Sequence, residues 1–121
     1  NIAIQGELMG PGIQGNREKL KTTEFFLFDV WNIDAQEYEK PDIRNLIVDR
    51  LKEWGPNLKT VPFVERTNLT KFKENIVDNI LQYADGPSLN SSIIREGVVF
   101  RSINHNYSFK AINNRYLLEN E

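Results

Sequence analysis

Two short apolar segments near the end of the chain each carry one charged residue suited to phosphate and metal chemistry. The first, EGVVFR, begins with Glu96, and the second, SFKAIN, contains Lys110. A carboxylate can bind Mg²⁺ or its water ligands, and a lysine ammonium can bind a phosphate. Val, Ile and Phe favour strands, and the SINHNY segment between them is rich in the turn formers Asn and Ser. We therefore expect a hairpin with Glu96 and Lys110 on neighbouring strands. For either residue alone, a charge on an exposed strand face is the ordinary alternative.

The beginning of the chain carries a second combination of this kind. IAIQGELMGPGIQGN, at residues 2–16, is followed by EFFLFDVW at residues 24–31. In a strand, alternate residues share a face, so Gln5 and Glu7 should lie together on the more polar side, with a buried sheet behind the apolar side. The Gly-Pro-Gly sequence at 10–12 should end this strand in a turn.

These four blocks, in this order, resemble the nucleotidyltransferase domain of ATP-dependent RNA ligases, the nick-sealing branch of the covalent nucleotidyltransferases. GEL-x-GPGIQ is similar to motif III of that family, FLFD to motif IIIa, EGVVF to motif IV and SFK to motif V. The resemblance extends from Ile2 to about Leu118. It implies a partial nucleotidyltransferase domain that binds ATP and a divalent ion, Mg²⁺ or Mn²⁺.

The resemblance also implies a role for one residue in each block. Glu7 would bind the ribose of the nucleotide, and Phe28 would stack on the adenine, with Phe25 and Phe26 as competing aromatics. Glu96 would act on the metal ion, directly or through its water ligands, and Lys110 would contact the AMP phosphate. We expect Glu7, Phe28, Glu96 and Lys110 to line one cleft.

The sequence departs from the family pattern at two places. No K-x-D-G motif, which supplies the lysine nucleophile of the family, occurs here; the nearest string is YADG at residues 83–86, in an expected helix-ending turn. The resemblance therefore implies a piece of a longer ligase whose nucleophile lies upstream, with a self-contained but degenerate relative as the alternative. Ile112 replaces a second lysine that many relatives carry in motif V, which leaves Lys110 alone or assigns that charge elsewhere, with Arg115 as a candidate.

Composition places the chain among ordinary globular proteins. It has 121 residues, 40% of them hydrophobic and 26% charged, which fits one domain. No apolar run is long enough for a membrane span. The absence of cysteine excludes disulfides and fits a cytoplasmic location. The net charge of −2 argues against binding nucleic acid over the whole surface, although Arg17, Lys19 and Lys21 could contact an RNA backbone or simply form a solvated loop.

Strand and helix patterns alternate without a regular βαβ repeat, so we expect an α+β fold, mainly an antiparallel sheet with flanking helices. Besides the first strand and the hairpin, the expected elements are a central strand Phe25–Trp31, a short edge strand Val61–Val64, and three helices. The first helix starts near Pro41 and ends at Gly55, with Ile43, Leu46, Ile47, Leu51 and Trp54 as its apolar stripe. The second has Phe72, Ile76, Ile80 and Leu81 inward and Gly86 as its stop, and the third covers 113–119. His105, in the hairpin turn, is expected at the surface.

As the resemblance implies, the whole enzyme would attach AMP to its own lysine, transfer it to the 5′-phosphate of an RNA, and seal that end to a 3′-hydroxyl. Its partners would be ATP, such RNA ends, and the missing N-terminal part of its own domain. A DNA ligase or capping-type nucleotidyltransferase, and a non-catalytic nucleotide- or RNA-binding module, remain the alternatives. A K-x-D-G motif upstream in the parent sequence would decide for an enzyme.

Overall fold

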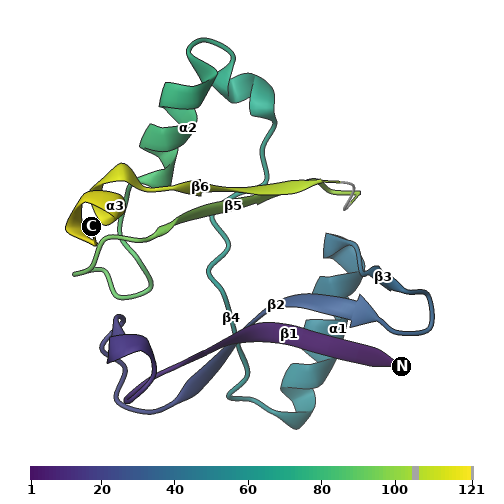
Figure 1. Cartoon of the computed structure of the whole chain (residues 1–121). Helices are drawn as coiled ribbons and strands as arrows, with labels where there is room; N and C mark the ends of the chain where they lie inside the picture. The colour runs from purple at the N-terminus through teal and green to yellow at the C-terminus, as the bar shows by residue number, and fades with distance from the viewer. Residues whose placement is uncertain (105–106, 121) are drawn as a thin grey trace. The chain divides into compact units, whose positions relative to one another are not determined.

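A computed structural model describes residues 1–104 and 107–120 (Figure 1). The chain groups into two compact units, which we describe one at a time. Unit 1 consists of residues 1–61 with the turn residues 102–104, and unit 2 of residues 62–101 and 107–120. The expectation of one domain over residues 1–121 stays a prediction. His105 lies outside the described residues.

Unit 1 is built on a four-stranded sheet in which β2 is central. β1 (Ile2–Met9) pairs antiparallel with one edge of β2 (Glu24–Asn32). β3 (Glu37–Tyr38) pairs antiparallel and β4 (Lys59–Thr60) parallel with β2. β2 is thus the central strand that the sequence predicts.

A β-bulge interrupts the pairing of β1 with β2. Gln5 pairs with Asp29, but the next residue, Gly6, pairs with Leu27, so the register of the two strands skips Phe28. An extra residue of this kind bends a strand and re-aims a side chain. The alternation of side chains along β2 therefore breaks at Phe28.

Helix α1 (Pro41–Trp54) covers β2 through one apolar face. Leu27, Val30 and Val48 form the buried centre, and Ile47 and Leu51 of α1 pack around it with Phe25 and Leu58. The helix begins with proline at its first position and is followed by Gly55, as expected.

Several residues of unit 1 that were expected to be buried are exposed. In α1, Ile43, Leu46 and Trp54 are 47%, 63% and 89% exposed, because the helix presents Ile47, Val48 and Leu51 to the sheet instead. The apolar face of β1 is not buried either, since α1 packs over β2. Its exposed residues are Ile2, Ile4 and Leu8, at 41%, 43% and 52%.

Unit 2 is a hairpin packed against a helix. β5 (Gly97–Arg101) and β6 (Ser108–Ile112) are antiparallel, as the sequence predicts, and α2 (Ile76–Ala84) contacts both. Phe72, at the end of a short 3-10 helix (Leu69–Phe72), is 3% exposed and meets Tyr83 and Phe100 edge-on. The ring of Phe100 stacks on that of its strand partner Phe109. Helix α3 (Asn114–Glu119) ends the unit.

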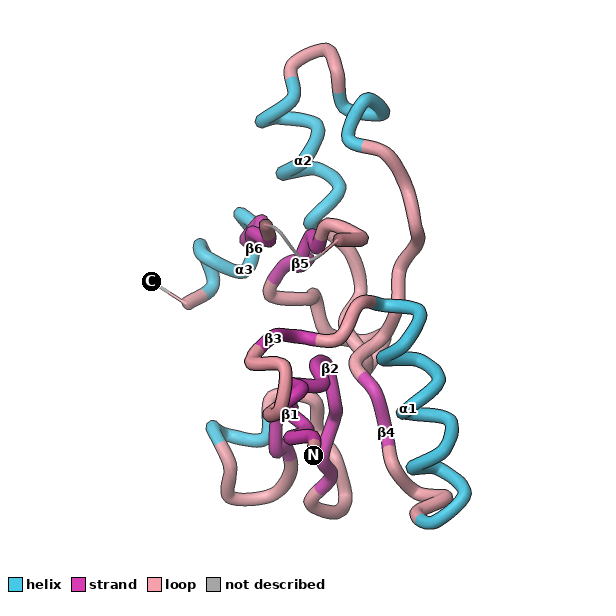
Figure 2. Tube along the Cα trace, turned by 90° about the vertical axis from the view of Figure 1, so that its right-hand side faces the viewer, coloured by secondary structure: helices cyan, strands magenta, loops and turns pink. Residues whose placement is uncertain are grey.

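Three sequence expectations are wrong here. Ile76, expected to face inward from the second helix, is 45% exposed because it lies at the first position of α2. Val61–Val64 is not a strand. The chain continues from β4 as a loop (Figure 2). The pairing with β2 ends with the bond from the Val61 amide to the Leu27 carbonyl, and Pro62 has no amide proton to continue it. The second helix does not run unbroken from Phe72 to Gly86. Asn75 adopts a left-handed conformation before α2, and α2 ends at Ala84.

The expected fold class is confirmed: both sheets are mainly antiparallel, and helices flank them. Among the described residues, no helix combines the length and apolarity that crossing a bilayer requires.

Candidate functional site

Glu96 and Lys110 are brought together in unit 2 by the β5–β6 hairpin. Glu96 directly precedes β5, and Lys110 pairs with Val99 in the register of the hairpin. The Lys110 ammonium donates a hydrogen bond of 2.6 Å to Glu96 Oε1. Both side chains are partly exposed, at 47% for Glu96 and 43% for Lys110, so solvent or a ligand can reach the pair. The expected neighbouring carboxylate and ammonium are therefore present.

Gly97 allows the two strands to approach closely beside this pair. A Cβ at Gly97 would lie 2.1 Å from the carbonyl oxygen of Ala111. Any side chain there would force β5 and β6 apart. The glycine that follows Glu96 is thus required by the backbone packing of the hairpin.

Arg115, the candidate for the second positive charge of motif V, is hydrogen-bonded to Asp85. Its guanidinium donates to Asp85 Oδ1 from Nε at 2.9 Å and from a terminal nitrogen at 2.5 Å. This hydrogen bonding holds the pKa of the Asp85 carboxyl below its usual value. Asp85 caps the end of α2, so Arg115 ties α3 to α2.

Glu7 and Gln5 lie on one face of β1 in unit 1. Their partners on β2 are Phe26 and Asp29, and directly paired residues share a face of a sheet. Glu7 is exposed. Gly6, just before it, lies so close to β2 that a Cβ would come within 2.4 Å of the Phe26 carbonyl oxygen. The expected pairing of Gln5 and Glu7 on one face is confirmed.

The three aromatic candidates of β2 differ in burial. Phe26 is 2% exposed, and Phe25 packs against the buried cluster of unit 1. Phe28 is half-buried and occupies the bulge. Phe26 is thus a core residue and Phe25 packs against the core, which makes Phe28 the stronger candidate to meet a ligand.

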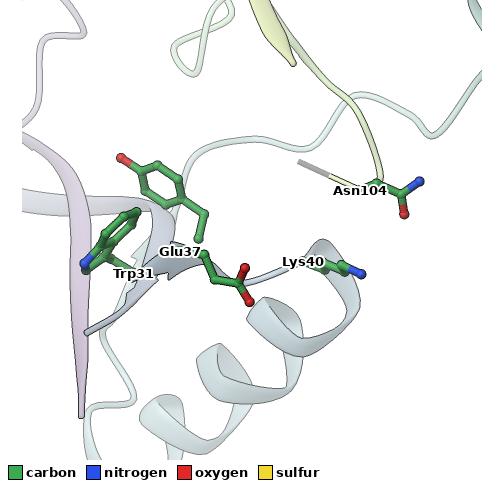
Figure 3. Close-up of a pocket in the computed structure, with 5 residues that line it drawn as sticks. Trp31, Glu37, Lys40 and Asn104 are labelled. Carbon is green, nitrogen blue, oxygen red and sulfur yellow. The ribbon is translucent and has the colours of Figure 1, made fainter. Parts of the chain in front are cut away.

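A small pocket that the sequence did not suggest lies in unit 1. It has a volume of about 230 Å³ and is lined by Trp31, Glu37, Tyr38, Lys40 and Asn104 (Figure 3). The rings of Trp31 and Tyr38 meet edge-on, and the Tyr38 hydroxyl donates to Gln5 Oε1 at 3.0 Å. Trp31 pairs with Ala3, two positions before Gln5. This wall of the pocket therefore belongs to the same sheet face as Glu7.

The basic residues after the first turn belong to a loop that Asn16 closes. The Asn16 side chain donates to the Leu20 carbonyl and accepts from the Leu20 amide, at 2.8 and 2.9 Å. Arg17 lies 3.9 Å from Glu18. Part of the positive charge of this loop is thus balanced within it.

The four predicted site residues divide between the two units: Glu7 and Phe28 belong to unit 1, and Glu96 and Lys110 to unit 2. Their convergence on one cleft stays a prediction. Across residues 1–104 and 107–120, no three or more His, Cys, Asp or Glu side chains gather in a group fit to hold a metal ion.

The chain matches a known protein family and several solved structures. The model of the RNA ligase family matches residues 1–112. No curated protein matches the chain. Among solved structures, a lysine-to-alanine mutant of Naegleria gruberi RNA ligase with ATP and Mn matches with a TM-score of 0.89 and 44% identity over 98% of this chain.

Two further structures of the Naegleria gruberi enzyme match over the same share of the chain. A glutamate-to-alanine mutant with AMP and Mn has a TM-score of 0.88 and 43% identity. The enzyme with PPi has a TM-score of 0.84 and 42% identity. This chain covers 34% of the length of each of these three structures. The chain belongs to the RNA ligase family.

Proposed function

We propose that this chain is part of an ATP-dependent RNA ligase, to which it contributes contacts to ATP and to a divalent metal ion. The family match over residues 1–112 and the likeness to a ligase solved with ATP and Mn support this function. Because the chain spans about a third of that enzyme, the remaining parts, including the lysine nucleophile, would come from the rest of the parent protein.

The observation that carries the proposal is the Glu96–Lys110 pair. These residues are 14 positions apart and joined by a 2.6 Å hydrogen bond. Two of the matched Naegleria gruberi structures are alanine mutants of a glutamate and of a lysine that are also 14 positions apart in that enzyme. Both structures contain a nucleotide and Mn. The pair thus corresponds in spacing and residue type to two positions of a nucleotide-binding ligase.

The reaction would proceed in three steps, which the family resemblance supplies. A lysine of the parent attacks the α-phosphorus of ATP, and pyrophosphate leaves as the lysine–phosphorus bond forms. The AMP then moves to the 5′-phosphate of an RNA, releasing the lysine. A 3′-hydroxyl finally attacks that phosphate, the phosphodiester forms and AMP leaves.

Glu96 and Lys110 would act where charge shifts during these steps. The metal ion, when bound, neutralises phosphate charge. Glu96 would hold it with one carboxylate, directly or through water, the phosphates of ATP providing further oxygens. Lys110 would donate to the α-phosphate from the opposite strand and stabilise the charge that develops as pyrophosphate departs.

Glu7 and Phe28 would bind the nucleoside part of ATP. An exposed carboxylate such as Glu7 can accept hydrogen bonds from ribose hydroxyls. Phe28, lifted out of the strand alternation by the bulge, would stack its ring on adenine. We further propose that RNA bearing 5′-phosphate and 3′-hydroxyl ends is the substrate of the parent enzyme.

Adenylylation of the full-length parent protein tests this function. Incubated with ATP and Mg²⁺, it should gain the mass of one AMP, and it should then seal a nicked RNA duplex whose nick carries a 5′-phosphate. The same duplex with a 5′-hydroxyl is the matched control and should stay open. A parent protein that binds ATP but forms no AMP adduct would favour a non-catalytic nucleotide-binding module.

A further inference from the structure

We propose that Asn113 is a positioning residue that sets the direction of the Glu96 side chain towards its metal ion. The inference rests on the proposed role of Glu96 in metal binding. It concerns a residue that no sequence motif assigned to the site and that lies at the end of the segment SFKAIN.

Asn113 holds both peptide groups that flank the Cα atom of Glu96. Its side-chain amide donates to the carbonyl of Arg95 at 3.0 Å. Its own backbone amide donates to the carbonyl of Glu96 at 2.8 Å. The orientations of these two peptide planes fix the direction of the Cα–Cβ bond of Glu96. Asn113 therefore fixes the direction of the Cα–Cβ bond from which the Glu96 carboxylate extends.

This restraint is needed because Glu96 lies just outside the paired part of the hairpin. The register of β5 and β6 begins with Gly97 opposite Ile112. Glu96 is thus anchored on one side by the hairpin and on the other by Asn113, which directly follows Ile112.

The Asn113 side chain is itself immobilised. It is 1% exposed and is among the largest fully buried side chains of the chain. Besides the bond to Arg95, its amide nitrogen donates to Asp85 Oδ1 at 3.1 Å, and its oxygen accepts from the Arg115 amide at 3.0 Å. A side-chain amide supplies the two donors and the acceptor that these three bonds require.

Arg95 adds a second anchor on the same side of Glu96. Its amide donates to the Gly86 carbonyl at 2.9 Å. Its guanidinium donates to the carbonyls of Tyr83, Ala84 and Asp85 at the end of α2. The residue preceding Glu96 is thereby fixed to a helix, and Asn113 joins that helix end to β6.

Groups that orient a metal ligand without touching the metal typically change affinity or activity about 10- to 100-fold when mutated. The test uses the full-length parent ligase and measures single-turnover adenylylation at saturating ATP as a function of Mg²⁺ concentration. We expect Asn113→Ala to raise the half-saturating Mg²⁺ concentration about 10-fold or more. Asn113→Asp should do the same. It keeps the shape but replaces the donor by an oxygen that faces the Arg95 carbonyl and the Asp85 carboxylate.

Phe72→Leu is the matched control. Phe72 is buried in the same unit at 3% exposure and packs on Tyr83 and Phe100. This variant should lower the melting temperature while leaving the half-saturating Mg²⁺ concentration unchanged. If Asn113→Ala does not accumulate as folded protein, Asp85→Ala removes a partner of the Asn113 amide and should shift the Mg²⁺ requirement in the same direction.

The outcomes separate this inference from the proposed function. If Glu96→Ala abolishes adenylylation while the Asn113 and Asp85 variants shift the Mg²⁺ requirement no more than Phe72→Leu, the positioning role is wrong and the function stands. If Glu96→Ala itself leaves rate and Mg²⁺ requirement unchanged, the metal role of Glu96 fails and the positioning role fails with it.

Discussion

At the scale of single residues, the proposed chemistry depends on two side chains of opposite charge. In the full-length parent, Glu96→Ala and Lys110→Ala should each slow adenylylation about 10²- to 10³-fold, because each removes a preorganised contact at a site of shifting charge. Arg17→Ala should weaken RNA binding in a salt-dependent way and leave the ATP step nearly intact. Single-turnover AMP transfer, with and without RNA, distinguishes the two effects. Near-normal adenylylation by both the Glu96 and the Lys110 variants would exclude the ligase site proposed here.

Two phenylalanines of β2, two positions apart, should respond in opposite ways. Phe26→Ala should destabilise the fold by about 3–5 kcal/mol, since Phe26 is 2% exposed. Phe28→Ala should cost less stability but weaken ATP binding in the parent by about 1–3 kcal/mol, the usual loss when base stacking is removed. Urea unfolding and calorimetric titration with ATP measure the two quantities. Unchanged ATP affinity in Phe28→Ala would show that Phe28 does not stack on adenine, and that either Phe25 or no aromatic of β2 does so.

The Asp85–Arg115 pair should make the stability of unit 2 depend on pH in the acid range. Hydrogen bonds from Arg115 lower the pKa of Asp85 from its ordinary value of 3.8, so the pair stabilises the folded state fully above that value. This contribution is lost as the pH falls through the lower, folded-state pKa. The melting temperature should therefore fall more steeply below about pH 4 in the original chain than in Asp85→Asn. Parallel acid profiles for the two proteins would show that the pair contributes nothing.

At the scale of elements, the hairpin depends on a glycine beside its charged pair. Gly97→Ala should destabilise the protein by about 1–3 kcal/mol, because its Cβ would press on the Ala111 carbonyl and separate β5 from β6. Gly55→Ala is the control, since there the nearest atom would lie 3.8 Å away. Urea unfolding of both variants measures the difference. Equal stabilities would mean that the strands can part at no cost.

The sequence predicted those elements whose local pattern and tertiary surroundings agree. The hairpin, the strand around Phe25–Trp31 and the helix after Pro41 were found because apolar pattern, proline and glycine all point to the same structure. The inward face of α1 was assigned too broadly, since Leu46 and Trp54 continue its apolar pattern but lie outside it. The pattern records which residues are apolar, and not how much surface the chain has available to cover them.

The candidate site likewise has features that local motifs predict and features that depend on tertiary contacts. Glu7, Glu96 and Lys110 can be proposed from the sequence because each stands in a motif. The bulge at Phe28 depends on a shift in pairing between two strands that are distant in sequence, and no local signal marks it. The network of Asn113, Asp85 and Arg115 escaped notice for the same reason, since its members come from the ends of three different elements.

At the scale of the whole molecule, the chain contains the residues proposed to contact the nucleotide but lacks the motif that, as the resemblance implies, supplies the nucleophile. No K-x-D-G motif occurs among its 121 residues. Incubated with ATP and Mg²⁺, the isolated chain should therefore stay unmodified, which intact-mass spectrometry can check. The full-length parent, treated identically, provides the positive control. A stable AMP adduct on any lysine of the isolated chain would show that it contains its own nucleophile.

Glu96 and Lys110 form an ion pair, so each of these two charges partly neutralises the other. A divalent cation arriving alone would have to displace an ammonium group that the carboxylate already holds. A nucleotide accompanied by its cation offers each partner a replacement at once, phosphate for the lysine and metal for the glutamate. If Glu96 and Lys110 act as proposed, their ion pair therefore favours an order of events in which metal and ATP enter together.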